Sequence, residues 1–170
     1  SKSIRYHIYP QMIEKLISGG QTGADQGALY AAKELKIQTG GSITKNYMTE
    51  KGTNLQLKQF NLNELNTSSY VERTMKNIED SDATIVFRFK KSKGSDKTIG
   101  YCISKKWTEY PDKSEQFFKP LLIINRFDFD VDIVRNFIKK YNVKVLNVAG
   151  NRQSLFNYDF QENVKNYLIN

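Results

Sequence analysis

The sequence is poor in the side chains that most often bind metal ions or assist a catalytic nucleophile. Cys102 is the only cysteine and His7 the only histidine among 170 residues. A single cysteine excludes an internal disulfide and a cysteine-based metal cluster within one chain. Because His7 lies in a terminal segment, the rest of the chain has no histidine for a catalytic triad or a multi-histidine metal site. We therefore predict no catalytic residues and no metal site.

Long apolar runs are also absent from the sequence. No stretch is apolar enough to span a membrane, and no N-terminal apolar block follows a basic start. Together with the single cysteine, this pattern favours a cytoplasmic protein with no membrane partner. A chain of 170 residues is long enough to bury a genuine core, and we expect one domain.

Basic residues outnumber acidic ones, and the net charge of +8 makes nucleic acid one candidate partner. The lysines are scattered along the chain, however, and no basic–aromatic array, zinc-finger spacing or RNA-recognition signature accompanies them. A basic composition of this kind is more often that of a solvated surface. Nucleic acid therefore stays as a less favoured alternative.

The apolar pattern from residue 13 onward alternates between strand-like and helix-like segments. Strands are predicted at residues 13–18, 37–43, 83–89, 120–125 and 143–149. Helices are predicted at residues 25–36, 69–79, 97–107, 131–141 and 160–168. Repeated strand–helix units predict an α/β fold with a mostly parallel central sheet and helices on both faces. In such sheets, ligands bind beyond the carboxyl ends of the strands.

Two segments depart from this alternation. We interpret residues 1–11 as an N-terminal extension and residues 12–170 as a single ligand-binding domain. Residues 44–68 are rich in Asn, Thr, Lys and Gln, with scattered leucines. Long connections in compact domains are usually functional lids or flexible segments. We predict that residues 44–68 form a loop or lid packed over the edge of the sheet.

The most informative motif is the run Ser-Gly-Gly-Gln-Thr-Gly-Ala-Asp at residues 18–25, between the first predicted strand and the first predicted helix. Glycines let the backbone approach a ligand closely, and a helix N-terminus offers unpaired N–H donors and a positive dipole end. These features predict a phosphate or other anion site. The run is neither G-x-G-x-x-G nor a P-loop, because no Lys-Ser/Thr pair follows it. Thr22 and Asp25 have the spacing of a capping box, so a tight turn before a capped helix is the structural alternative.

Three further loops should meet the glycine turn at the same edge of the sheet. The pair Gly40–Gly41 ends the second predicted strand, although two glycines can simply make a turn. The loop at residues 90–98 carries hydroxyl and lysine side chains that could bind an anion. The segment 147–154 contains Arg152, which could hold a phosphate or carboxylate in bidentate fashion or pair with a surface carboxylate.

The predicted helix at residues 69–79 carries two neighbouring stripes of side chains. Tyr70, Arg73 and Asn77 fall at i, i+3 and i+7 and form one polar stripe. This stripe could line a pocket or could be a solvated face. The adjacent apolar stripe, which should face the core, consists of Val71, Met75 and Ile78.

Taken together, these motifs resemble those of the molybdenum-carrier proteins. That family is a branch of the Rossmann-like superfamily that includes the cytokinin-activating "lonely guy" phosphoribohydrolases and lysine-decarboxylase-like proteins. The resemblance covers nearly the whole chain from residue 13. It implies a Rossmann-like three-layer sandwich, often a homo-oligomer, with a pocket for a phosphate-bearing small molecule. The matching segments are Ser18 to Asp25, Gly40-Gly41, Tyr70…Arg73…Asn77…Asp80-Ser81-Asp82-Ala83-Thr84, and Asn147-Val148-Ala149-Gly150 with Arg152 and Ser154.

The ligand that this resemblance implies is the molybdenum cofactor, held by its pterin-linked phosphate. Gly19 to Gly23 would cradle the phosphate, with Ser95, Thr98 and Arg152 completing the pocket. The chain departs from the family pattern in three loops, which affects the identity of the ligand more than the fold. The departures are Thr44-Lys45-Asn46 in place of a lysine–glycine pair, Gly94-Ser95-Asp96-Lys97-Thr98 in place of two glycines with a threonine, and Asn151 and Gln153 in place of proline and glutamate.

The phosphoribohydrolase relatives use a glycine-rich motif that includes a threonine and a glutamate. Here residues 94–100 contain Asp96 but no glutamate, so hydrolysis of a glycosidic bond is not supported residue by residue. An acid–base pair could still be drawn from Asp25 and Asp82 if the fold brings them together.

The sequence therefore predicts a protein that binds a phosphate-bearing small molecule, a nucleotide or the molybdenum cofactor, without catalytic residues. An enzyme resembling nucleoside-monophosphate phosphoribohydrolases and a basic nucleic-acid-associated protein are the alternatives. The predicted ligand-binding residues are Gly19, Gly20, Gln21, Thr22, Gly23, Asp25, Gly40, Gly41, Arg73, Asn77, Gly94, Ser95, Thr98, Asn147, Gly150 and Arg152.

Overall fold

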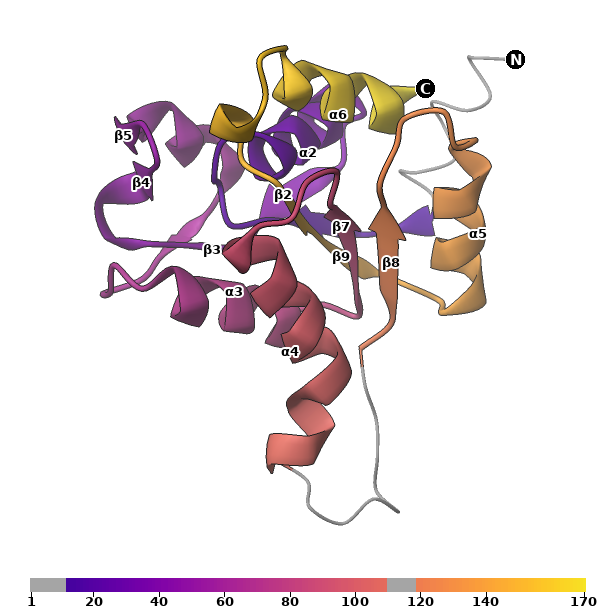
Figure 1. The fold of residues 1–170 in the computed structure, drawn as a ribbon, viewed down its shortest axis with the longest axis horizontal. Coiled ribbons are helices and arrows are strands. Elements are labelled where there is room, and N and C mark those ends of the chain that lie inside the picture. The colour runs from indigo at the N-terminus through magenta and orange to yellow at the C-terminus, as the bar shows by residue number, and fades with distance from the viewer. Residues whose placement is uncertain (1–11, 110–118) are drawn as a thin grey trace.

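The fold is an α/β sandwich built on a five-stranded sheet, seen in a computed structural model that describes residues 12–109 and 119–170 (Figure 1). The predicted extension at residues 1–11 lies outside the described residues. All pairings within the five-stranded sheet are parallel, with strand order β2-β1-β9-β7-β8. This arrangement confirms the predicted Rossmann-like class. The strands are β1 (Lys15–Ile17), β2 (Gln38–Gly40), β7 (Ala83–Phe87), β8 (Leu121–Ile124) and β9 (Val145–Gly150).

Helices cover both faces of the sheet, because parallel strands need crossover connections that return along the outside. Helices α2 and α6 pack against each other, and α3 packs against α4 on the other side of the sheet (Figure 1). None of the helices in the described residues is both long enough and apolar enough to cross a membrane. The helices are α2 (Ala24–Glu34), α3 (Tyr70–Glu79), α4 (Lys93–Glu109), α5 (Asp132–Lys140) and α6 (Phe160–Ile169).

The second predicted strand is broken in two by a glycine. Strand β2 ends at Gly40, and β3 (Ser42–Ile43) leaves the five-stranded sheet to pair with β6 (Asn63–Glu64). Gly41 has a φ of +116°, and a Cβ atom there would lie 2.3 Å from the carbonyl oxygen of Ser18. The residue between the two strands must therefore be glycine for the chain to pass so close to β1.

The segment at residues 44–68 contains regular structure instead of being a plain loop. It holds the β4–β5 hairpin (Met48–Thr49 and Gly52–Thr53), strand β6 and the 3₁₀ helices η1 (Lys45–Tyr47) and η2 (Leu55–Phe60). Leu57 and Phe60 of η2 are buried, and the Thr39 hydroxyl of β2 donates to the Phe60 carbonyl over 3.0 Å. Burial of these apolar side chains holds the segment against β2, the edge strand on that side.

Candidate ligand-binding site

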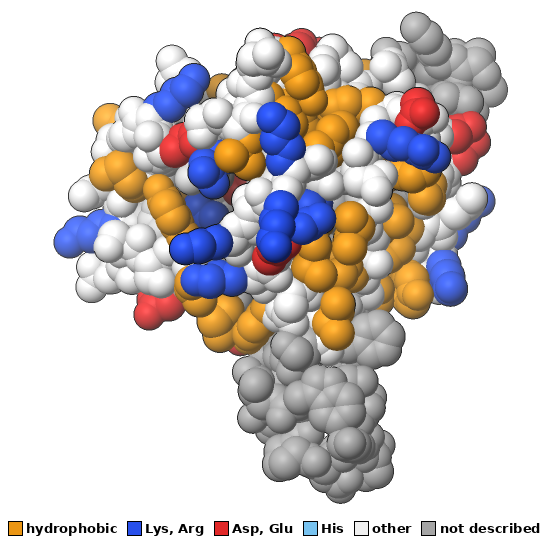
Figure 2. Space-filling view, viewed as in Figure 1, with side chains coloured by type: hydrophobic (Ala, Val, Ile, Leu, Met, Phe, Trp, Pro, Cys, Tyr) orange, Lys and Arg blue, Asp and Glu red, His pale blue; other side chains and the backbone are white. Residues whose placement is uncertain are grey.

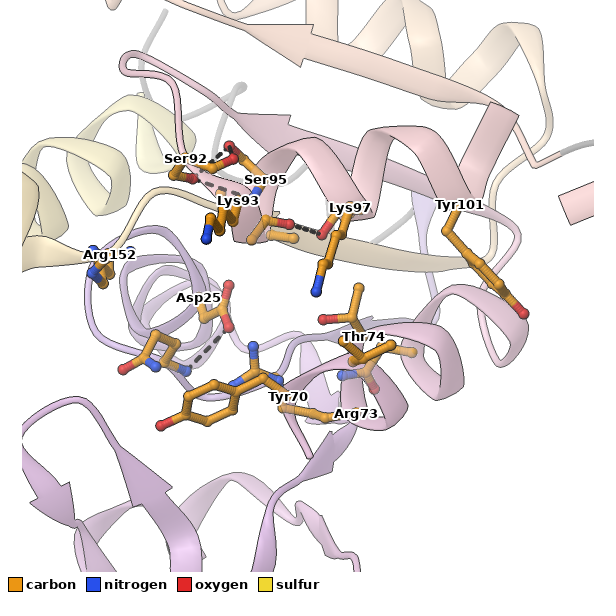
Figure 3. A pocket seen from close by; sticks show the side chains of 18 of the residues that line it. Asp25, Tyr70, Arg73, Thr74, Ser92, Lys93, Ser95, Lys97, Tyr101 and Arg152 are labelled. Atoms are coloured by element: carbon orange, nitrogen blue, oxygen red, sulfur yellow. Dashed lines mark hydrogen bonds between the residues drawn. The ribbon is translucent and has the colours of Figure 1, made fainter. Parts of the chain in front are cut away.

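The carboxyl ends of the central strands open into a pocket of about 570 Å³ beside α3 and α4 (Figure 3). This volume lies in the range typical of small-molecule sites. The turn after β1 contributes Gly19, Gln21 and Asp25, and the end of β9 contributes Asn147 and Gly150. The structure therefore brings together three of the four loops that the sequence placed at one edge, those at residues 19–25, 90–98 and 147–154.

Most of the predicted ligand-binding residues line this pocket. Those that do are Gly19, Gln21, Asp25, Arg73, Asn77, Gly94, Ser95, Thr98, Asn147, Gly150 and Arg152. Those outside the lining are Gly20, Thr22, Gly23, Gly40 and Gly41. Gly40 ends β2, and Gly41 serves the close passage of the chain beside β1.

The backbone of the glycine turn is occupied by the protein's own acceptors. The Gly20 N–H donates to Ser18 Oγ (3.2 Å), the Thr22 N–H to Gln21 Oε1 (3.0 Å) and the Gly23 N–H to Gln161 Oε1 (2.9 Å). In this conformation these three N–H groups are not the unpaired donors that the sequence suggested for a phosphate cradle. Gly23 instead makes a close backbone contact, since a Cβ atom there would lie 2.4 Å from the Asn151 carbonyl oxygen.

Asp25 does not form the capping box that its spacing with Thr22 suggested. The N-cap of α2 is Gly23, with no side-chain hydrogen bond, and Asp25 lies in the first turn. Its Oδ2 accepts the Gln21 N–H over 3.1 Å. Burial raises the pKa of Asp25 to about 6, despite the opposing effects of the Arg73 charge and the Gln21 N–H. Asp25 is therefore a buried carboxyl group of the pocket that can titrate near neutral pH.

Arg73 lies over the glycine turn and reaches past Tyr70 toward Asp25 (Figure 3). A Cβ atom on Gly19 would lie only 2.6 Å from Arg73 Nε, so the absence of a side chain at Gly19 makes room for the guanidinium group. The Arg73 Cζ atom lies 4.7 Å from the centre of the Tyr70 ring, in cation–π geometry. Nε and Nη1 are buried without a hydrogen-bond partner among the described residues. Arg73 is half-buried, and its unused donors form a binding feature that the described residues leave incomplete.

The remaining residues of the α3 stripes take roles that periodicity alone did not predict. The Asn77 side chain accepts the Ser42 N–H (2.7 Å) and donates to the Ser42 carbonyl (3.0 Å), so it anchors α3 to β3. Val71 is 41% exposed and lines the pocket instead of the core, whereas Ile78 is fully buried as predicted. Met75 is half-buried and also lines the pocket. This pocket side of α3, consisting of Tyr70, Val71 and Met75, is called the apolar wall below.

Helix α4 starts at Lys93, earlier than predicted, because Ser92 caps it. Ser92 Oγ accepts the Ser95 N–H (3.2 Å), and the Ser92 carbonyl accepts the Asp96 N–H (3.0 Å). The predicted anion ligand Ser95 shares a hydrogen bond with Ser92 Oγ (2.7 Å), and Thr98 Oγ1 donates to the Gly94 carbonyl (3.0 Å). These two hydroxyl groups are therefore already used within the helix.

The open donors of α4 are its first backbone N–H groups and two lysines. Within the described residues, the N–H groups of Lys93 and Gly94 have no hydrogen-bond partner. The side chains of Lys93 and Lys97 extend from α4 over the pocket, on the side facing Asp25 and Thr74 (Figure 3). Free N–H groups at a helix start, together with lysine charges, suit an anionic group.

Arg152 lies at the rim of the pocket and pairs with a carboxylate. Its Nε lies 3.2 Å from Glu50 Oε2 and 3.2 Å from Ser154 Oγ, and its side chain is 45% exposed. Glu50 Oε1 also accepts from Thr22 Oγ1 (2.5 Å) and the Ser154 N–H (3.0 Å). Burial would raise the pKa of Glu50, but the hydrogen bonds from Ser154 and Thr22 and the Arg152 charge outweigh it and lower the pKa. Thr22 and Arg152 therefore tie the β4–β5 hairpin to the rim of the pocket.

Asp96 and Asp82, the two other carboxylates considered for catalysis, lie away from this site. Asp96 Oδ1 accepts from Arg88 Nε over 2.9 Å, and Asp96 does not line the pocket. Asp82 Oδ2 accepts the N–H groups of Lys144 (2.9 Å) and Val145 (2.8 Å), at the amino end of β9. Asp25 lies at the carboxyl ends of the parallel strands and Asp82 at their amino ends, so the two residues do not form an acid–base pair.

Several lining residues were not among the predicted site residues. Tyr70 was visible in the polar stripe, and Lys93 and Lys97 in the basic loop, but Glu50 gave no signal because its contacts come from residues 22, 152 and 154. The lining residues outside the predicted set are Glu50, Tyr70, Val71, Thr74, Met75, Ser92, Lys93, Lys97, Gly100, Tyr101 and Ala149.

Comparisons with known proteins agree on one family. The model of the "Circularly permutated YpsA SLOG family" matches residues 16–169. The chain is also similar to the crystal structure of a "Putative molybdenum carrier protein" from Syntrophus aciditrophicus SB, with 29% identity and a TM-score of 0.74. The match covers 92% of this chain and 95% of that chain. A search of curated proteins gave no match.

Proposed function

Because the chain belongs to the circularly permutated YpsA SLOG family, we propose that its pocket binds a phosphate-bearing small molecule and that the protein acts as a carrier or ligand-binding protein. The candidate ligands are a nucleotide and the molybdenum cofactor. The name of the similar solved structure, a molybdenum carrier, supports the second.

The observation that carries this proposal is the chemical difference between the two sides of one pocket. The α4 side offers Lys93, Lys97 and the free N–H groups at the helix start, which suit a phosphate group. The apolar wall on α3 offers Tyr70, a residue that is 41% exposed and whose aromatic ring suits a flat heterocycle. A ligand with an anionic group at one end and a ring at the other would use both sides.

The residues of the pocket fit the organic part of the molybdenum cofactor. A pterin ring could lie on the apolar wall with its phosphate on the α4 side, and the Arg73 guanidinium group could donate to an acceptor that a pterin supplies. No group of three or more His, Cys, Asp and Glu side chains in the described residues could hold a metal ion. Molybdenum would therefore be carried as cargo on the cofactor.

Thermal unfolding with a ligand panel tests the proposal. The panel holds nucleoside monophosphates, the matching nucleosides and molybdopterin, because a ligand that binds only the folded state stabilises it by about 2.7 kcal/mol at a hundredfold excess over Kd. We expect a selective shift for phosphorylated ligands. The double variant Lys93→Ala/Lys97→Ala should lose most of that shift, whereas Lys139→Ala, an exposed lysine on α5, should keep it. A shift that is equal for nucleosides and nucleotides would contradict the phosphate assignment.

Asp25 supports a second candidate function, hydrolysis of a nucleoside monophosphate at its glycosidic bond. A buried carboxyl group with a pKa raised to about 6 in a ligand pocket is suited to acid–base chemistry. Release of ribose 5-phosphate from any nucleoside monophosphate would support this candidate, and no release from all of them would exclude it. A nucleic-acid partner has less support, since Lys and Arg side chains are distributed among neutral and apolar ones on the face shown in Figure 2.

A further inference from the structure

The pocket contains a cation and a carboxyl group whose hydrogen-bonding needs are complementary. Arg73 forms no hydrogen bond with the described residues, and its Nε and Nη1 are buried. Nη2 is the guanidinium nitrogen outside that buried pair, so a ligand acceptor would approach from its side. Arginine offers only donors, so a ligand group that pairs with it must supply an acceptor.

Asp25 offers the opposite chemistry on the adjoining part of the pocket (Figure 3). Its Oδ2 is held by the Gln21 N–H, and Oδ1 has no hydrogen-bond partner among the described residues. As a carboxylate, Asp25 accepts hydrogen bonds and donates none. Arg73 and Asp25 form no ion pair within the described part of the chain, so neither satisfies the other.

We propose that Arg73 and Asp25 together recognise a lactam edge on the ligand ring, meaning a carbonyl group next to a ring N–H. Arg73 donates to the carbonyl oxygen, and Asp25 Oδ1 accepts from the ring N–H. This inference rests on the proposed function, because it assumes that the ring of a phosphorylated ligand lies in this pocket. It names the ligand class as 6-oxopurines and pterins.

The opposite edge, found in 6-aminopurines, does not fit these two residues. Adenine presents an amino donor and a ring nitrogen acceptor where guanine and hypoxanthine present a carbonyl acceptor and an N–H donor. Its amino group would face the donors of Arg73, and its ring nitrogen would face the carboxylate of Asp25. An adenine ring would therefore leave the polar groups of Arg73 and Asp25 unpaired, and a penalty of this kind gives strong selectivity against the wrong base.

Direct titration of the whole protein with GMP, IMP and AMP tests this assignment. We expect GMP and IMP to bind at least about tenfold more tightly than AMP. Their lactam edge can form both hydrogen bonds, whereas the adenine edge has its donor and acceptor exchanged and can form neither. Asp25→Asn should bring the ratio of the AMP and GMP Kd values close to one. In that variant the Gln21 N–H holds Oδ1, and the amide nitrogen then faces the ring N–H with a donor. Asp80→Asn, at an exposed aspartate of the Lys76 ion pair, is the matched control and should keep the preference.

The ratio of the AMP and GMP Kd values should also depend on pH. A purely structural role of Asp25 would not change this ratio with pH. Below about pH 6 Asp25 takes up a proton, which must lie on Oδ1 because Oδ2 accepts from Gln21, and the site then offers a donor to the ring N–H. The ratio should fall by about tenfold between pH 8 and pH 5. Titration of the ligand phosphate cancels, because GMP and AMP share it. The other charged groups lining the pocket are Arg73 on α3, Lys93 and Lys97 on α4, Glu50 in the β4–β5 hairpin and Arg152 after β9.

The outcomes separate this inference from the proposed function. Equal binding of GMP, IMP and AMP, or a preference that Asp25→Asn and pH leave unchanged, overturns the lactam assignment and leaves phosphate binding standing. No binding of any of the three, nor of molybdopterin, overturns both. If Asp25→Asn fails to fold, the wild-type ratio and its pH dependence still decide the matter.

Discussion

The replacement Glu50→Gln tests whether the β4–β5 hairpin is held at the pocket by charge. Glu50 has a side chain that is only 15% exposed, and it accepts four interactions from three residues. Its Oε1 accepts from Thr22 Oγ1 (2.5 Å) and the Ser154 N–H (3.0 Å), while Oε2 accepts from Ser154 Oγ (2.6 Å) and lies 3.2 Å from Arg152 Nε. Glutamine has nearly the same shape, so the change removes charge without making a cavity.

The expected loss of unfolding free energy is about 2 kcal/mol at pH 7. Hydrogen bonds to a charged group contribute about 1.5–3 kcal/mol, and the new amide would direct a donor at groups that themselves donate. For a domain of this size, about 2 kcal/mol corresponds to a fall in Tm of roughly 4–8 °C. Urea unfolding monitored by circular dichroism gives the free energy directly.

The pH dependence of this loss identifies its electrostatic origin. The folded state lowers the pKa of Glu50, so its contribution is present above the pKa of the unfolded chain and is lost as pH falls through the folded pKa. The difference between wild type and Glu50→Gln should therefore shrink below about pH 4.3. Glu34→Gln is the control, because the Glu34 side chain is 55% exposed and its ion pair with Lys165 Nζ is long, at 3.8 Å. A loss below about 0.5 kcal/mol, or one that persists unchanged into acid, would refute the reasoning.

Two further predictions concern the turn beneath the pocket. The pKa of Asp25 shifts in the opposite direction to that of Glu50, because folding raises it from 3.8 to about 6. The folded state therefore binds more protons than the unfolded chain, and the wild type loses stability as pH rises between these two values. Urea unfolding of Asp25→Asn should lack this slope, and a slope that persists in the variant would assign it to another group. Gly23→Ala should destabilise the protein by about 3 kcal/mol, because φ is +83° and the new Cβ would lie 2.4 Å from the Asn151 carbonyl oxygen. Gly52→Ala, with a φ of +97° and nothing within 4 Å, should cost less, and equal losses would argue that only the backbone angle matters.

The elements that the sequence predicted well carry a clear local signal. Helix α5 shows a helical apolar repeat, with Val134 and Ile138 in the core. Strand β7 is buried at every residue and was predicted from a short apolar run rich in β-branched and aromatic residues. Element ends were less accurate. The start of α4 depends on the cap at Ser92, which the periodic pattern does not contain.

Topology predicted that the loops after β1, β7 and β9 lie at the carboxyl ends of the strands, but the sequence did not show which hydrogen bonds their residues form. The glycine turn has the composition of an anion site, yet one of its N–H groups is taken by Gln161, which is 138 residues away from Gly23. Val71 has a helical spacing from Ile78, but α3 packs mainly against α4 and β3, and the Val71 end of its apolar stripe lines the pocket. Contacts between distant residues decided both cases, and local patterns do not encode them.

The strand order has a consequence for how the chain can assemble during synthesis. Strand β9 is the last strand of the sequence, yet it lies in the middle of the sheet and pairs with both β1 and β7, which do not pair with each other. Until residues 145–150 leave the ribosome, the earlier strands of the five-stranded sheet can form only two separate native pairs, β1–β2 and β7–β8. Such long-range closure slows folding and leaves open strand edges exposed in the nascent chain. The pocket, whose floor includes Asn147 and Gly150, can therefore form only after this final strand has been inserted.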